Sequence, residues 1–197
     1  MPYEADLRAD ARRNRQQIVT AALALFREQG IEVPMEEIAA RAGVGVGTLY
    51  RRFPNRDALI WATARESLRS QVVLAETALT TEPDAWAALC RFLRECAELR
   101  IGALAAAIEP GLHTAIQADP ELRGIRQALI DLIERMTARA RADGALRADV
   151  GREEVGLLMT LQIYTPPQAD PDLAMRRVVD IMLDGLRAAP GPASSGS

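Results

Sequence analysis

The stretch over residues 38–53, IAARAGVGVGTLYRRF, constrains the fold of this chain more than any other. Ile38 and Ala42 have helical spacing, and Gly43 follows where a helix end favours a residue that tolerates positive φ. A second short helix is expected to run to Phe53, because a proline comes directly after it. Two short helices joined by a tight turn form a helix-turn-helix, whose second helix enters the major groove of DNA.

The second helix of this pair carries polar and basic side chains on its outer side: Thr48, Tyr50, Arg51 and Arg52. The alternative interpretation is an ordinary helical hairpin in a protein core, which has no use for such a set. Leu49 is expected to face the core instead.

Composition excludes several classes of protein. The 197 residues are 49% apolar and 26% charged, as in a soluble globular protein. No apolar run approaches the roughly 20 residues that span a bilayer, and the N-terminus lacks a signal pattern, so we expect a cytoplasmic protein with no membrane partner. Cys90 and Cys96 lie on one expected helix and cannot form a disulfide while it is intact. With a single His, no metal site or cofactor is expected.

Periodic apolar residues predict an all-α chain, with residues 1–9 frayed. Residues 1–56 are expected to form a three-helix DNA-binding head, residues 57–188 a larger helical body for ligand binding and dimerisation, and residues 189–197 a disordered tail. Outside the helix-turn-helix, the expected helices cover residues 10–29, 56–79, 84–109, 113–118, 120–143, 155–164 and 171–186.

The last two expected helices are apolar nearly all the way round, whereas a surface helix needs only one apolar stripe. They lie either at the centre of the monomer or at an interface with a partner. We favour the interface, because C-terminal helices are awkward candidates for the centre. Its expected residues are Val155, Leu158, Leu161, Gln162, Val178, Val179, Met182, Leu183 and Leu186.

Spaced residues within 13–68 also follow a family pattern. They are Ile18-x3-Ala22-x2-Leu25-Phe26-x3-Gly30, Ile38-Ala39-x3-Gly43-Val44, Gly47-Thr48-Leu49-Tyr50-x2-Phe53 and Arg56-Asp57-x-Leu59. With these residues the chain resembles the TetR (tetracycline repressor) family of bacterial transcriptional regulators. Arg147-Ala148-Asp149-Val150, Glu153-Glu154-Val155 and Leu183-Asp184-Gly185-Leu186-Arg187 are similar, more weakly, to the SbtR-like subgroup.

The resemblance implies a homodimer built on the last two long helices, a ligand pocket in the body and a double-stranded, palindromic DNA operator. Arg51 could read guanine through O6 and N7, or it could be solvated or bound to phosphate. Arg52 stands where many members have His, and Pro34-Met35 where many have Ser or Thr. The expected DNA-binding residues are Arg13, Gly45, Val46, Gly47, Thr48, Tyr50, Arg51, Arg52 and Arg56, the last at the position of the family's phosphate-binding Lys.

Candidate ligand contacts come from the middle helices. They are Trp86, Phe92, Cys96, Leu104, His113, Met136 and Met159. An apolar residue at helical spacing is more often core than pocket. His113 follows Pro110-Gly111, where a break between helices could open a cavity. The mostly apolar set favours a hydrophobic or aromatic small-molecule effector.

The function that these features favour is a DNA-binding repressor released from its operator by a small molecule. An activator of the same fold is left open. A helical ligand carrier or enzyme is the alternative from another class, but we find no nucleophile–base pair, and Gly43-x-Gly45-x-Gly47 lacks the preceding strand of a dinucleotide site. We therefore expect a protein that is not an enzyme.

Overall fold

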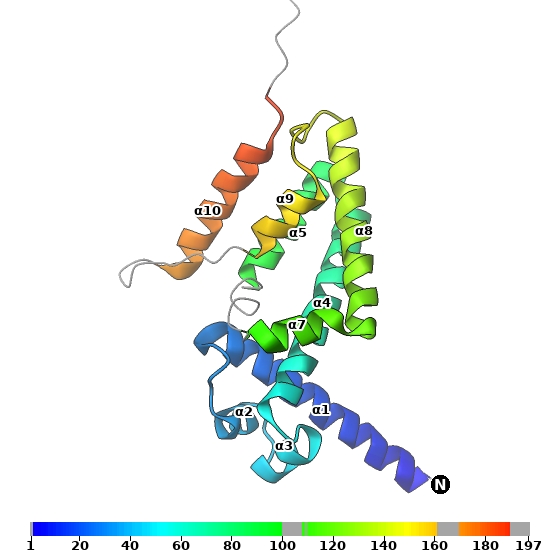
Figure 1. Ribbon diagram of the computed structural model, residues 1–197, viewed down its shortest axis with the longest axis vertical. Helices are drawn as coiled ribbons and strands as arrows, with labels where there is room; N and C mark the ends of the chain where they lie inside the picture. Colours follow the sequence, from blue (N-terminus) through cyan, green and yellow to red (C-terminus); the bar gives the residue numbers. More distant parts are fainter. Residues whose placement is uncertain (1, 100–107, 109, 161–169, 190–197) are drawn as a thin grey trace, which may run out of the picture. The chain divides into compact units, whose positions relative to one another are not determined.

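The computed structural model describes residues 2–99, 108, 110–160 and 170–189, and in these residues the fold is all-α, as predicted. No strand occurs in this part of the chain, and none of its helices is long and apolar enough to cross a bilayer. The helices, labelled in Figure 1, are α1 (Pro2–Gln29), α2 (Met35–Arg41), α3 (Val46–Arg52), α4 (Arg56–Thr81), α5 (Ala85–Glu98), α7 (Pro110–Ala118), α8 (Pro120–Ala142), α9 (Arg152–Met159) and α10 (Pro171–Leu186).

The chain divides into two compact units. The first combines residues 1–70 with 103–124, and the second combines residues 71–102 with 125–197. The first therefore holds α1, α2, α3 and α7 with the beginning of α4, whereas the second holds α5, α9 and α10 with most of α8. Nearly all of the tail expected at 189–197 lies outside the described residues.

In the first unit, α1, α2 and α3 pack around one core. Ile18, Leu25 and Phe26 of α1 are almost fully buried, together with Ile38 of α2 and Leu49 of α3. Burial of large apolar side chains supplies most of the favourable free energy in such a small three-helix head. The apolar positions predicted from helical spacing therefore form the core that fixes α3.

The turn between α2 and α3 has the geometry that Gly43 predicts. Gly43 adopts a positive φ of 67°. Its N–H donates to the carbonyl of Ala40 (3.1 Å), and the N–H of Val44 donates to the carbonyl of Ala39 (3.0 Å). This pair of bonds is a Schellman motif, which satisfies carbonyls that the end of α2 would otherwise leave unpaired.

In the second unit, α9 and α10 both pack on α5. Leu89 and Phe92 of α5 are fully buried, as are Met136 of α8 and Val155 of α9. These side chains form the core of this unit.

The end of α10 is held to the segment that follows α8. The N–H of Arg147 donates to the carbonyl of Leu186 (3.1 Å), and the N–H of Ala188 donates to the carbonyl of Ala145 (3.0 Å). This short antiparallel bridge fixes where α10 stops.

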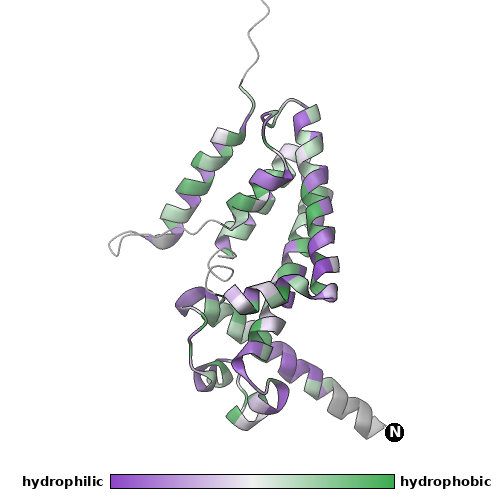
Figure 2. Cartoon of the chain, viewed as in Figure 1, coloured by the Kyte–Doolittle hydropathy of each residue, from purple (hydrophilic) through white to green (hydrophobic). Residues whose placement is uncertain are grey.

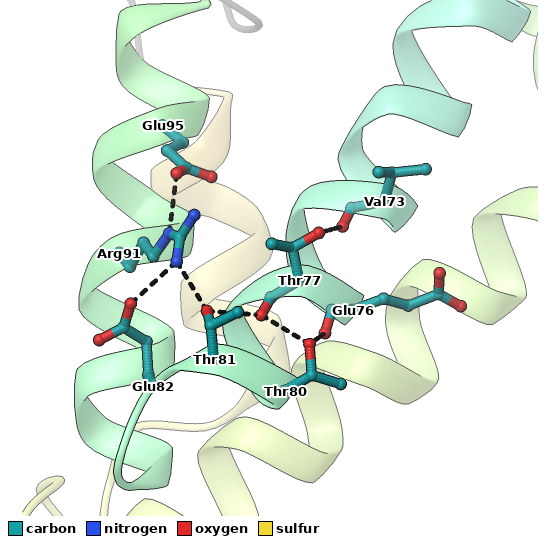
Figure 3. Close-up of polar contacts among 8 residues, drawn as sticks. All are labelled: Val73, Glu76, Thr77, Thr80, Thr81, Glu82, Arg91 and Glu95. Carbon is teal, nitrogen blue, oxygen red and sulfur yellow. Dashed lines mark hydrogen bonds and ion pairs between the residues drawn. The ribbon is translucent and has the colours of Figure 1, made fainter.

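A network of polar side chains fixes the corner between α4 and α5 (Figure 3). Nη1 of Arg91 donates to Oγ1 of Thr81 (2.7 Å) and to Oε1 of Glu82 (3.0 Å), and its Nε donates to Oε1 of Glu95 (2.9 Å). Oγ1 of Thr81 in turn donates to the carbonyl of Thr77 (2.8 Å), one turn earlier in α4. The last turn of α4 is thus fastened to α5 within the second unit.

Several predicted helix ends are wrong, among them those of the helix expected at 155–164, which is α9 (Arg152–Met159). α1 begins at Pro2 rather than near residue 10, since proline suits the first position of a helix and the residues after it are mostly helix formers. α5 ends at Glu98, although apolar residues continue at helical spacing towards residue 109. Pro110 begins α7 instead of interrupting a helix, again as a first-turn proline.

Candidate nucleic-acid interface

The helix α3 presents one face to the core and another to solvent. Leu49 is buried, whereas Val46 and Tyr50 are 38% and 43% exposed. Arg51 and Arg52 are also exposed. The outward side chains that the sequence predicts therefore share the accessible side of a helix that the core holds in place.

The first turn of α3 is small and accessible. Gly45 is the N-cap residue, and it and Gly47 are exposed. A Cβ atom at either glycine would meet nothing within 4 Å in this chain. No contact within the chain thus requires glycine at these two positions. Their small size leaves open space beside the first turn of α3.

Two of the candidate DNA contacts bond to each other. Nη2 of Arg51 donates to Oγ1 of Thr48, 2.9 Å away and one turn earlier in α3. The hydroxyl therefore holds the guanidinium over the outer face of the helix. This bond restricts the rotamers of Arg51 in the free protein.

The two candidate arginines outside α3 have different surroundings. Arg13 on α1 is exposed, and its Nη1 lies 3.9 Å from a carboxylate oxygen of Asp10. Arg56, at the start of α4, is half-buried, and its Nη1 donates to the backbone carbonyls of Ile31 and Val33 (2.7 Å to Val33). Arg13 thus lies at the surface beside a carboxylate, whereas Arg56 is engaged inside the head.

Sequence reasoning missed residues on α1 and α2 that surround Arg13. The guanidinium of Arg15 lies over the ring of Phe53, 5.1 Å from its centroid, beside the end of α3. A shallow groove between α1 and α2 is lined by Arg13, Gln16, Gln17, Thr20, Ala21, Ala24, Arg41 and Ala42. The spacing of Arg13, Gln17 and Thr20, which places them on one helical face, is the sequence signal that could have predicted this groove.

The candidate ligand residues that the structure describes differ in burial and belong to both units. Phe92, Cys96 and Met136 are almost fully buried in the second unit, where burial raises the pKa of the Cys96 thiol to about 12. Trp86 and Met159 are half-buried. Leu104 lies outside the described residues. His113 belongs to α7 in the first unit, and its Nε2 lies 3.0 Å from the side-chain nitrogen of Gln117.

A small cavity in the second unit lies between α5 and α10. Its volume is about 120 Å³. At its rim, Nε and Nη2 of Arg94 both lie 3.1 Å from Oδ1 of Asp180. The cavity is lined by Arg94, Ala97, Glu98, Met175, Arg176, Val179 and Asp180, none of which is a predicted ligand contact.

The predicted interface residues fall into three groups. Val155, Val179 and Leu183 are buried within the chain itself, in the core of the second unit. Leu161 and Gln162 lie outside the described residues. The half-buried group consists of Leu158, Val178, Met182 and Leu186.

Large apolar side chains that the prediction omitted are the most exposed on these two helices. Leu157 on α9 is 69% exposed, and Leu173 and Ile181 on α10 are 65% and 60% exposed. Figure 2 shows hydrophobic residues along α10, whose other side packs on α5. An exposed apolar surface of this kind is typical of a protein–protein contact.

Comparison with known proteins identifies the architecture. The pattern of the family "Bacterial regulatory proteins, tetR family" matches residues 18–63, and that of "Transcriptional regulator SbtR-like, C-terminal domain" matches residues 84–188. Helix-turn-helix-type transcriptional regulators of Staphylococcus aureus are 41% identical over 63 residues, which are 32% of this chain. That match spans only 34% of the length of those relatives.

Two solved structures match nearly the whole chain. The TetR transcription regulatory protein from Mycobacterium vanbaalenii is 34% identical, with a TM-score of 0.67, and the match covers 92% of this chain and 99% of that one. The TetR transcriptional regulator SCO0520 from Streptomyces coelicolor is 30% identical, with a TM-score of 0.62 and coverage of 89% and 99%.

A helix-turn-helix head joined to a helical C-terminal domain of regulator type defines a DNA-binding transcriptional regulator. This chain belongs to the TetR family, with an SbtR-like C-terminal domain. The family consists of regulators rather than enzymes. Its members bind DNA operators and typically form dimers that respond to small-molecule effectors.

Proposed function

We propose that this regulator is a repressor, which binds a palindromic operator as a homodimer and leaves it when a small molecule binds the body. The accessible face of α3 carries the proposal, since Val46, Tyr50, Arg51 and Arg52 project from a helix whose Leu49 is locked in the core. A dimer places two such helices in successive major grooves, about 34–36 Å apart.

Repression is tested with a reporter gene behind the promoter that the purified protein protects. Expression that rises when the gene for this chain is deleted supports repression. Expression that falls on deletion identifies an activator and refutes this part of the proposal.

On α3 we assign base reading to Arg51 and positioning on the phosphate backbone to Tyr50 and Arg52. Arginine forms bidentate bonds to O6 and N7 of guanine, and the bond that Arg51 donates to Oγ1 of Thr48 holds its guanidinium on the exposed part of α3. Val46, at the accessible first turn, suits apolar contact with a thymine methyl group. Arg13 on α1 provides a further phosphate contact.

Thr48 and Arg51 are expected to act as one unit in specificity. Replacing Arg51 by alanine should cost about 1–3 kcal/mol of specific binding and relax one operator position. Thr48→Val keeps the side-chain shape but removes the acceptor, so it should relax the same position. Fluorescence anisotropy with operators changed one base pair at a time measures both effects.

A double-mutant cycle completes this test. Because the two residues share one bond, the double variant should lose less than the sum of the single losses. Thr48→Ser keeps the hydroxyl and serves as the matched control, with specificity close to that of the unchanged protein. Additive losses, or relaxation at two different operator positions, contradict the assignment.

For the dimer we assign the outer side of α9 and α10. Leu157, Leu173 and Ile181 are the exposed anchors, and the half-buried Val178 and Met182 flank Ile181 on α10. An apolar surface of this kind is stable in water when a second copy covers it. The buried Val179 and Leu183 support α10 from the inside.

For the effector we assign the cavity between α5 and α10. Its volume of about 120 Å³ lies below the roughly 300–1,000 Å³ of pockets that hold drug-sized ligands. A larger ligand therefore has to move α10 relative to α5 and break the Arg94–Asp180 ion pair at the rim. Since α10 also carries the proposed dimer anchors, such a movement would alter the dimer.

A further inference from the structure

The connector between α1 and α2 leaves backbone carbonyls outside any helix. The carbonyls of Ile31 and Val33 both accept a hydrogen bond from Nη1 of Arg56, at 2.7 Å for Val33. In the described part of the chain, no backbone N–H donates to either carbonyl. One side chain from α4 thus satisfies two groups of a segment that precedes it by more than twenty residues.

The base of this side chain is itself fixed. Arg56 is the first residue of α4, and Oδ1 of the preceding Asn55 accepts the N–H of Ala58 (2.9 Å), as an N-cap does. Leu59, one turn further on, is fully buried. The guanidinium therefore reaches the connector from a helix end that the head's core holds in place.

We propose that Arg56 is a positioning residue that fastens the α1–α2 connector to the first turn of α4, and that it does not act as a phosphate contact. The connector leads directly into α2, so the fastening makes the helix-turn-helix and the beginning of α4 move as one body. When that part of α4 is displaced, α3 is then displaced with it. The consequence for DNA rests on the proposed operator binding.

The two roles of Arg56 differ in their dependence on salt. A phosphate contact releases a counterion, so each one contributes about 0.9 to the slope of log affinity against log salt concentration. A residue that acts through backbone carbonyls changes affinity without changing this slope. The free protein differs too, because only the fastening role protects backbone amides when DNA is absent.

Hydrogen exchange of the free protein provides the first measurement. The amides of Glu37 and Ile38 donate to the carbonyl of Pro34, at the end of the connector. Arg56→Met, which keeps bulk but no donor, should raise their exchange rates about tenfold, because a bond from a charged donor is lost at two carbonyls. The amide of Val44, at the other end of α2, is the internal reference and should not change.

Arg56→Lys keeps the charge and serves as a second variant in case Arg56→Met does not fold. Its ammonium ends one bond short of Nη1, and we expect intermediate exchange rates at Glu37 and Ile38. Exchange as slow as in the unchanged protein in both variants would overturn the proposal, whether or not the protein binds DNA.

The salt dependence of operator binding provides the second measurement. Arg56→Met should lower affinity about tenfold at one salt concentration and leave the slope unchanged. Arg52→Ala, the control for a phosphate contact, should lower the magnitude of the slope by about 1.8 for the two copies in a dimer. An equal fall for Arg56→Met would overturn the proposal. A control that leaves the slope unchanged would refute the role of Arg52 instead, and the exchange experiment would still decide the role of Arg56.

Discussion

Replacing Ile181 by aspartate is expected to separate the proposed dimer and to lower operator affinity by about 100- to 10,000-fold, the usual gain from linking two binding modules. Ile181 is 60% exposed on α10, so the substitution should leave each chain folded. In a dimer, however, it places two uncompensated carboxylates in an apolar contact. Analytical ultracentrifugation gives the state of association, and anisotropy gives the affinity.

The control variant matches the chemistry of this change. Val73 on α4 is also a large exposed apolar residue, at 58%, and it lies outside the proposed interface. Val73→Asp should leave both association and operator binding unchanged. If Ile181→Asp stays folded and dimeric and binds as the unchanged protein does, the outer side of α10 is not the interface.

Truncation of Phe92 to alanine is expected to lower the free energy of unfolding by about 3–5 kcal/mol, the range for large aromatic residues removed from a core. Phe92 is fully buried on α5, although its spacing in the sequence also suited a ligand contact. Its removal leaves a cavity and loses the transfer free energy of the ring. Urea unfolding followed by circular dichroism measures the difference.

The same measurement separates a core residue from the wall of an open pocket. Trp86 lies on the same helix but is half-buried, with the guanidinium of Arg187 over its ring at 5.6 Å from the centroid. Trp86→Ala should therefore cost clearly less than Phe92→Ala. Equal and small losses in both variants would mean that Phe92 lines a pocket that is open in the free protein.

The head could be predicted in detail because its signals are local. Gly43 ends α2 with a positive φ, and Pro34 and Asn55 mark the beginnings of α2 and α4. Each signal acts through bonds to residues at most four positions away. The turn and the position of α3 therefore follow from the sequence, and so do the outward-facing residues of α3.

The hydrogen bonds of Arg56 could not be predicted, because its partners are distant in the sequence. Nothing about the residues around it indicates that its guanidinium meets the carbonyls of Ile31 and Val33. Family resemblance pointed to a phosphate contact instead. Side chains that act through packing or through backbone groups of another segment are visible only in three dimensions.

The two C-terminal helices show a further limit. A helix that is apolar all round offers no contrast between its inner and outer sides, so spacing alone does not decide whether Val179 or Ile181, two residues apart and on opposite sides, faces the core. The structure separates them, since Val179 is buried and Ile181 is exposed. Packing against α5 thus determines which apolar residues of α10 stay exposed and available to the proposed dimer contact.

Footprinting of the purified protein on DNA from its own promoter region tests the central claim most directly. We expect two protected half-sites related by two-fold symmetry, with centres one helical turn apart, about 34–36 Å, and loss of protection in Ile181→Asp. Protection of a single asymmetric half-site that persists in Ile181→Asp, or no protection even at low salt, would contradict the account.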